Sequence, residues 1–128
     1  MFQQTQFILY VANQEKSKQF YQNVLRLNPV LDIPGMTEFE LSPGTKLGLM
    51  PESGIKKILQ NNISNPASGN GIPRCEIYLL VDNIQKYTNK LLQNGAKLIS
   101  PAKNRDWGHK VAYFADFDGH IIAFAEKT

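Results

Sequence analysis

The chain has 128 residues, 42% of them hydrophobic, which suits one compact domain or two half-size modules that share a core. No apolar stretch approaches the roughly 20 residues that span a bilayer, the first residues lack a signal-peptide pattern, and the lone Cys75 excludes an internal disulfide. We therefore expect a cytoplasmic protein with no membrane partner, and the mild net charge of +3 on scattered side chains argues against nucleic acid.

Residues 1–60 read as a strand, a helix and three further strands. Residues 5–11, TQFILYV, are rich in β-branched and aromatic side chains and predict a strand. Asn13 then predicts a helix N-cap. Apolar residues follow it at helical spacing: Phe20, Tyr21, Val24 and Leu25. The segments PVLDI, MTEFEL and KLGLM predict three short strands separated by turns.

The same order of elements recurs in residues 74–128. The segment CEIYLLV predicts a strand, Asp82 or Asn83 predicts a helix cap, and the pair Asn94 and Gly95 ends the helix. AKLIS, HKVAYFA and HIIAFAE predict three more strands.

The two halves can be superposed through strand, cap and helix, with Val11 on Val81. Residues 61–73 between them are dense in Asn, Ser, Gly and Pro and predict a flexible linker. We therefore predict an α+β fold of two tandem βαβββ modules, at residues 1–60 and 74–128.

Several of these features together resemble the vicinal oxygen chelate superfamily, which includes glyoxalases, bleomycin-resistance proteins and extradiol dioxygenases. The features are a strand ending in Val, a polar cap, an FY pair in the helix and a late segment WG...YF.D.DGH. The most specific match is DFDGH, residues 116–120, with Phe117 where Pro is usual. The resemblance implies curved mixed sheets that enclose a cavity, and a homodimer in which each cavity is built from one chain or from two.

The histidines and carboxylates near the C-terminus raise the question of a metal site. In metal-chelating relatives the ligands come from the first and last strands of each module, and the resemblance places Gln6, Glu76 and Ala123 at such positions. Alternation along the strand puts His120 on the opposite face, and the aspartates of DFDGH ordinarily bond nearby amides. Two donors fall short of the three protein ligands of a typical site, so we expect no metal and no other cofactor.

The same alternation predicts the face that lines the cavity. From the first strands it takes Gln6, Tyr10, Glu76 and Tyr78. Met50 joins them from the last strand of the first module, and pairing Ala115 with His120 in the last hairpin would add Phe114. These residues either line a ligand pocket or fill a core, and the carboxylate of Glu76 favours the pocket because an unpaired charge is costly in a filled core.

The segment RDWG, residues 105–108, lies in a loop that helps cover the cavity mouth in relatives. Trp107 and Arg105 could hold a planar or anionic ligand by stacking and charge. The alternative is that Trp107 seals a sheet edge while Arg105 pairs with a surface acid. His109 could act as a general base or a donor, but nothing in the sequence supplies its partner.

Three classes of function remain. The first is a metal-independent glyoxalase-like or bleomycin-resistance-like protein that binds a small aromatic or amphipathic molecule. The second is a metal-dependent lyase, isomerase or thiol transferase of the glyoxalase type, against which Ala123 stands. The third is a pocketless dimeric interaction protein. The candidate ligand-binding residues for the first class are Gln6, Tyr10, Met50, Glu76, Tyr78, Arg105, Trp107, His109 and Phe114.

Overall fold

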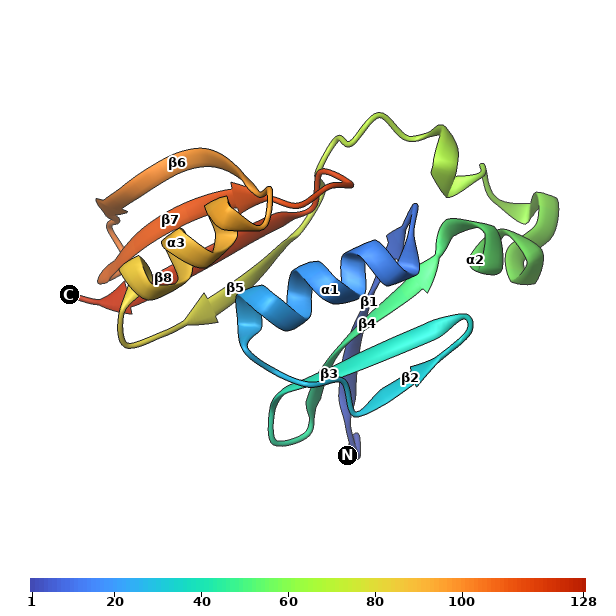
Figure 1. Ribbon diagram of the computed structural model, residues 1–128, viewed down its shortest axis with the longest axis horizontal. Helices are drawn as coiled ribbons and strands as arrows, with labels where there is room; N and C mark the ends of the chain where they lie inside the picture. Colours follow the sequence, from blue (N-terminus) through green and yellow to red (C-terminus); the bar gives the residue numbers. More distant parts are fainter. The chain divides into compact units, whose positions relative to one another are not determined.

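The computed structural model describes residues 1–128, which divide into two compact units, Met1–Asn70 and Gly71–Thr128. Each unit holds a four-stranded mixed sheet with a helix packed on it, as can be followed for each in Figure 1. The α+β class and the two modules predicted from the sequence are confirmed. None of the helices has the length and apolar character that crossing a membrane requires.

The first unit contains, in chain order, β1 (Thr5–Val11), α1 (Gln14–Leu25), β2 (Leu31–Ile33), β3 (Met36–Ser42), β4 (Thr45–Pro51), α2 (Glu52–Leu59) and the short 3-10 turns η1 (Gln60–Asn62) and η2 (Pro66–Ser68). Its strands lie in the order β1-β4-β3-β2, with β1 parallel to β4 and the other neighbours antiparallel. Asn13 caps α1 as predicted, because its side-chain oxygen accepts the backbone N–H of Lys16 at 2.9 Å.

One face of the first sheet is covered by α1 and carries the core of this unit. Leu9 and Val11, at alternate positions of β1, are buried. The helix contributes Phe20, Tyr21 and Val24 to the same core. Because side chains alternate along a strand, Gln6 and Tyr10 lie on the opposite face, which no helix of this unit covers. We call the uncovered face of each sheet its open face.

An ion pair joins α1 to β2. Lys18 Nζ lies 2.9 Å from Asp32 Oδ2 and 2.9 Å from Glu15 Oε2. Asp32 also accepts a hydrogen bond from the hydroxyl of the buried Thr37. The hydrogen bond from Lys18, followed by that from Thr37, lowers the pKa of Asp32. These contacts fix the β2–β3 hairpin against the helix.

The second unit contains β5 (Glu76–Leu80), α3 (Ile84–Gln93), β6 (Lys97–Asn104), β7 (His109–Ala115) and β8 (Ile121–Lys127). Its strands lie in the order β5-β8-β7-β6, which repeats the order of the first unit. Asn83 rather than Asp82 caps α3, since its side-chain oxygen accepts the backbone N–H of Gln85 at 2.9 Å. The carboxylate of Glu126 accepts a hydrogen bond from another free backbone N–H at this end of the helix, that of Ile84.

The aromatic packing identifies which face of the second sheet α3 covers. Tyr87 of α3 stacks on Phe124 with ring centres 4.7 Å apart, and Phe114 meets Phe124 edge-on at 6.4 Å. Phe114 and Phe124 are both fully buried. Ala123 precedes Phe124 on β8 and therefore lies on the open face, as predicted.

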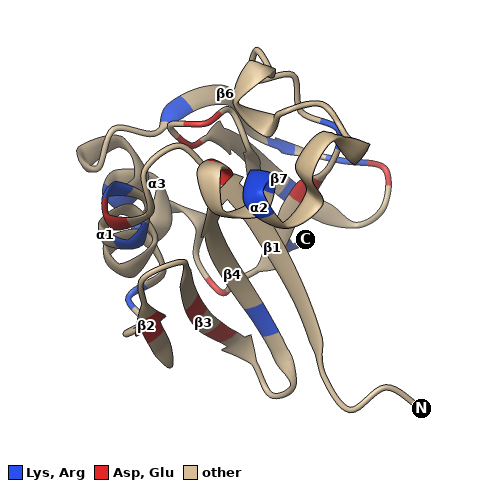
Figure 2. Ribbon diagram, turned by 90° about the vertical axis from the view of Figure 1, so that its right-hand side faces the viewer, with Lys and Arg blue, Asp and Glu red and all other residues tan.

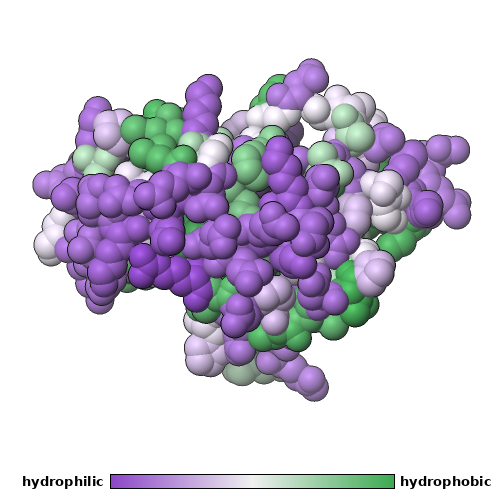
Figure 3. Space-filling model, viewed as in Figure 1, coloured by the Kyte–Doolittle hydropathy of each residue, from purple (hydrophilic) through white to green (hydrophobic).

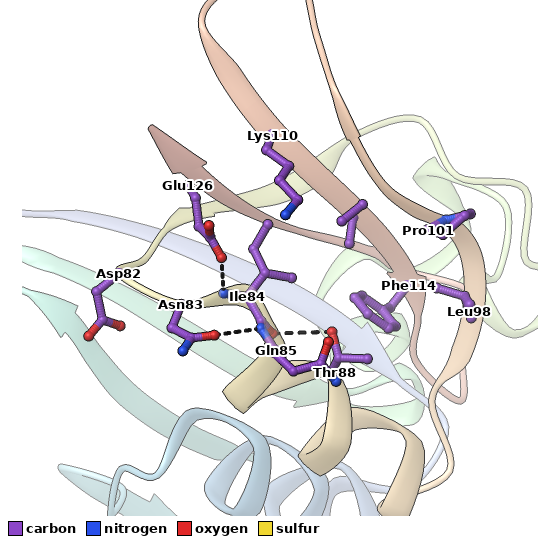
Figure 4. Close-up of a pocket in the computed structure, with 12 residues that line it drawn as sticks. Asp82, Asn83, Ile84, Gln85, Thr88, Leu98, Pro101, Lys110, Phe114 and Glu126 are labelled. Atoms are coloured by element: carbon purple, nitrogen blue, oxygen red, sulfur yellow. Dashed lines mark hydrogen bonds between the residues drawn. The ribbon is translucent and has the colours of Figure 1, made fainter. Parts of the chain in front are cut away.

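The placement of Phe114 predicted from the sequence is wrong. The hairpin pairs Ala115 with Ile121, not with His120, so Phe114 lies opposite Ile122 and Tyr113 lies opposite Ala123. A shift of one residue moves every side chain of a strand to the other face. Phe114 consequently points toward α3 (Figure 4), and Tyr113 takes the place on the open face.

Candidate functional site

Three residues selected from the sequence meet at one end of the open face of the second sheet. The indole N–H of Trp107 donates to the hydroxyl of Tyr78 at 2.9 Å, and that hydroxyl lies 2.7 Å from His109 Nδ1. The rings of Tyr78 and His109 are 5.9 Å apart and tilted by 30°. His109 thus has the partner that the sequence could not supply, and the indole is held in position although Trp107 is 57% exposed.

Beside this chain of hydrogen bonds lies a pocket of about 560 Å³, which we call the Trp107 pocket. It is formed by β6, β7, β8 and the loop between β6 and β7, and its lining is Ile99, Ser100, Asn104, Arg105, Asp106, Trp107, Tyr113 and Ile121. A volume of this size accommodates a small organic molecule, and a mainly apolar wall with a few polar groups is the usual composition of such sites.

The irregular course of β6 positions this pocket. The pairing of β6 with β7 shifts on both sides of Ser100, and the strand continues through Pro101 to Asn104, beyond the segment predicted from the sequence. A proline is tolerated there because β6 is an edge strand, which needs no amide donor on its outer side. The bulges leave Ile99 and Ser100 at the pocket wall, where Ser100 lies opposite Tyr113.

Arg105 extends along the wall of the Trp107 pocket. Its Nη2 donates to Ser100 Oγ at 3.2 Å, and its guanidinium carbon lies 5.4 Å from the centre of the Tyr113 ring. The surface acid that the sequence allowed as an alternative partner is not found, because none of the ion pairs of the protein includes Arg105.

Glu76 lies on the open face near the start of β5, opposite Ile121, and is exposed. Water can solvate this exposed carboxylate, so its charge no longer favours a pocket over a filled core. Glu76 remains a candidate contact for a ligand, but burial does not force that role.

On the open face of the first sheet the structure reveals a polar cluster that the sequence analysis missed. The amide of Gln6 donates to Glu38 Oε2 at 2.9 Å, and Lys46 Nζ lies 3.3 Å from Glu38 Oε1. Figure 2 shows this pairing as red positions on β3 beside a blue position on β4. Tyr10 and Met50, paired across β1 and β4, lie farther along the same face.

Gly48 makes the contact between Gln6 and Glu38 possible. It lies on β4, between the two strands that carry these residues, and is the pairing partner of both Ile8 and Glu38. A Cβ atom at Gly48 would lie 2.5 Å from the amide nitrogen of Gln6 and 3.0 Å from Ile8 Cγ1.

We expect Gly48→Ala to displace the Gln6 side chain, break its hydrogen bond to Glu38 and lower the free energy of unfolding by about 1 kcal/mol. Gly54→Ala in α2 is the matched control, because a Cβ there meets only Pro51 Cδ at 3.9 Å. In that helix alanine should be neutral or stabilising by up to about 1 kcal/mol. Urea unfolding of both variants measures the difference, and equal effects would contradict this role of Gly48.

A second hollow, of about 460 Å³, lies on the helix-covered face of the second sheet (Figure 4). The first two turns of α3 form one side, with Ile84 and Thr88, and Leu98 of β6 and Phe114 form another. Glu126 also borders this hollow, and its carboxylate is already engaged by the helix amide of Ile84. This hollow includes none of the residues selected from the sequence except Phe114.

The residues at the metal-ligand positions of the superfamily do not fit a metal. Gln6 is bound to Glu38, Glu76 is exposed, and Ala123 has no donor atom. Asp116, Asp118 and His120 do lie together, with potential ligand atoms within 4.8 Å of one another. Asp116 Oδ1, however, accepts the amides of Asp118 at 3.0 Å and His120 at 2.8 Å, which is the turn-stabilising role expected from the sequence.

The residues of the Trp107 pocket that were not selected from the sequence are Ile99, Ser100, Asn104, Asp106 and Tyr113, and Glu38 of the polar cluster was missed as well. For Tyr113 and Glu38 the sequence did contain features that indicate the face on which each side chain lies. Glu38 alternates with the apolar Phe39 in MTEFEL, which places its carboxylate on the face opposite the core. Tyr113 would have followed from a correct hairpin register.

Comparison with known proteins agrees with the resemblance seen in the sequence. The family model of the glyoxalase-like domain matches residues 4–128. No curated protein matches the sequence.

Solved structures with the same fold cover nearly the whole chain. A glyoxalase-related enzyme from Fulvimarina pelagi is 21% identical, with a TM-score of 0.82 over 99% of this chain and 89% of that one. A glyoxalase/bleomycin resistance protein/dioxygenase family enzyme from Burkholderia phytofirmans PsJN is 13% identical, with a TM-score of 0.82 over 96% and 97%. An antibiotic binding protein from Streptomyces sp. CB03234 is 22% identical, with a TM-score of 0.71 over 100% and 98%. At these identities the likeness concerns the fold.

Proposed function

The chain belongs to the glyoxalase-like domain family, and we propose that it is a metal-independent member that binds a small aromatic or amphipathic molecule in the Trp107 pocket. The observation that carries this proposal is the combination of an exposed indole, fixed by its hydrogen bond to Tyr78, with a pocket of ligand size beside it. An aromatic surface held in one position binds flat ligands at a low cost in conformational entropy.

The antibiotic binding protein from Streptomyces, which has the same fold, supports a small-molecule binding role. In this chain, Tyr113 and Ile121 offer apolar area beside Trp107. Ser100, Asn104, Arg105 and Asp106 add polar groups to the same lining, while the Tyr78 hydroxyl fixes the indole by accepting its N–H.

Metal independence rests on the donor set at the superfamily's ligand positions. With Ala123 in place of a carboxylate, Gln6 and Glu76 remain, and a typical metal site takes at least three protein ligands. Elemental analysis of protein prepared without chelators should accordingly find far less than one equivalent of zinc, nickel, iron or manganese. About one equivalent, lost in Gln6→Ala and Glu76→Ala proteins, would favour the metal-dependent lyase or isomerase instead.

The binding proposal is tested with a thermal-shift screen of aromatic and amphipathic metabolites. A ligand that binds only the folded protein raises the melting temperature in proportion to the logarithm of its concentration. We expect several compounds with planar rings to do so. A screen without a stabilising compound would favour the pocketless interaction protein.

We further propose that the chain acts as a homodimer in the cytoplasm. Large apolar side chains on the open faces support a covering partner, among them Ile8 and Tyr10 in the first unit and Tyr78 and Leu80 in the second. Figure 3 shows that the surface in that view is mostly hydrophilic, with apolar residues gathered in separate green patches. Sedimentation equilibrium should give twice the chain mass of 14.5 kDa, and a concentration-independent single chain mass would contradict the dimer.

A further inference from the structure

Arg105 carries a positive charge that no residue of the protein balances. The ion pairs of the protein involve other cations, namely Lys18, Lys46 and Lys86. Asp106 also lines the Trp107 pocket, but it is exposed and forms no ion pair with Arg105. The Nε atom of Arg105 is enclosed by protein and has no acceptor. A cation that is partly removed from water without a counter-charge is unfavourable, so an anion in the pocket would be stabilised beside it.

The guanidinium is also held in a defined position. Ser100 accepts from Nη2 at 3.2 Å, and Tyr113 lies under the guanidinium carbon at 5.4 Å. Both supporting residues belong to paired strands, where Ser100 lies opposite Tyr113. An arginine that is already restrained loses less rotamer freedom when it binds, and its planar N–H groups match the two oxygens of a carboxylate.

The rest of the pocket is suited to an aromatic body. Ile99, Ile121 and Trp107 contribute apolar surface around Arg105. A ring packed against this surface would place an attached carboxylate within reach of the guanidinium, because both groups line one pocket of about 560 Å³.

We propose that the ligand of the Trp107 pocket is an aromatic carboxylate, whose carboxylate binds the guanidinium of Arg105 while its ring packs against Trp107. This inference rests on the proposed function and adds the charge and the chemical class of the ligand to it. Aromatic amines and other cations are disfavoured by the same uncompensated charge.

The test compares naphthalene-2-carboxylate with naphthalene-2-carboxamide, which keeps the ring and loses the charge, by calorimetric titration of the full chain. We expect the acid to bind the unaltered protein about tenfold or more tightly than the amide, because charge-assisted hydrogen bonds are about twice as strong as neutral ones. Arg105→Gln should abolish this preference. Arg105→Lys, which keeps the charge without the planar fork, should retain a reduced preference.

Lys110→Gln is the matched control. It removes the same charge from the same unit, but Lys110 borders the hollow under α3 and not the Trp107 pocket. The Lys110→Gln protein should prefer the acid over the amide by the same factor as the unaltered protein.

Equal binding of acid and amide, or the same loss in Lys110→Gln as in Arg105→Gln, overturns the carboxylate assignment and leaves the pocket as a binding site. If neither compound binds at about 1 mM while other rings from the screen do, the assignment also falls. If no planar compound binds at all, the proposed function fails together with it.

Discussion

Phe114→Ala is expected to lower the free energy of unfolding by about 3–5 kcal/mol, the usual cost of deleting a buried aromatic ring. Phe114 is fully buried and its ring meets the Phe124 ring at 6.4 Å, on the face that α3 covers. Removing it leaves a cavity that neighbouring rings can fill only in part. Urea unfolding, followed by circular dichroism, measures the change.

Tyr113→Ala is the informative control, because Tyr113 is adjacent in sequence and lies on the other face of the same strand. It is partly exposed, so we expect a smaller loss of stability than for Phe114→Ala. Ligand binding should respond in the opposite order, falling in Tyr113→Ala and persisting in Phe114→Ala under conditions where that protein is folded. The reverse order would mean that the hairpin has the register with Ala115 opposite His120.

Trp107→Ala is expected to weaken the best ligand from the screen about tenfold or more, a loss of about 1.4 kcal/mol. The reason is that the indole supplies exposed aromatic surface next to the pocket and is fixed there by its hydrogen bond to Tyr78. The stability of the protein should change little, since Trp107 is 57% exposed. Calorimetric titration gives the affinity and thermal unfolding gives the stability.

Two further variants separate surface area from hydrogen bonding. Trp107→Phe keeps part of the aromatic area and loses the N–H group. Its affinity for the ligand should therefore lie between the affinities of the unaltered protein and of Trp107→Ala. Phe7→Ala removes an aromatic side chain that is 65% exposed in the first unit and is not part of the lining of the Trp107 pocket, so it should leave the affinity unchanged. A ligand that binds Trp107→Ala and Glu76→Gln as tightly as the unaltered protein would show that the site lies elsewhere.

Much of the fold follows from the sequence because burial on one face of a sheet imposes a period of two. In β1 this period places Gln6 and Tyr10 opposite the buried Leu9 and Val11. In β5 it places Tyr78 on the open face, where Trp107 and His109 reach it. The polar caps predicted for both helices are likewise present, since an asparagine before an apolar helical repeat satisfies free amides.

The hairpin register could not be obtained from the period alone, because it depends on the length of the turn. Asp116 pairs with His120 through a backbone hydrogen bond of 3.0 Å, which leaves residues 117–119 as the loop. Gly119 has a φ of 85°, which is the left-handed conformation usual at the last position of such three-residue loops. Read in this way, the glycine of DFDGH would have placed Tyr113, not Phe114, on the open face.

The pocket wall formed by β6 could not be predicted from the sequence for a different reason. It depends on two register shifts around Ser100, and the period of two along a strand does not show where such shifts occur. Ile99 and Ser100 therefore had no signal in the sequence, whereas Arg105 and Trp107 could be identified from their chemistry alone.

The indole N–H of Trp107 offers the most direct measurement of the binding site, because the chain has a single tryptophan and this group gives one signal in a ¹H–¹⁵N spectrum. The best ligand of the screen is titrated into the protein before and after treatment with a metal chelator. If the ligand occupies the Trp107 pocket without a metal, the indole signal and the amides of Tyr113 and Ile121 shift saturably with the same Kd in both samples. Shifts confined to α3 and the hollow beneath it, or binding that the chelator abolishes and added metal restores, would contradict the proposed site.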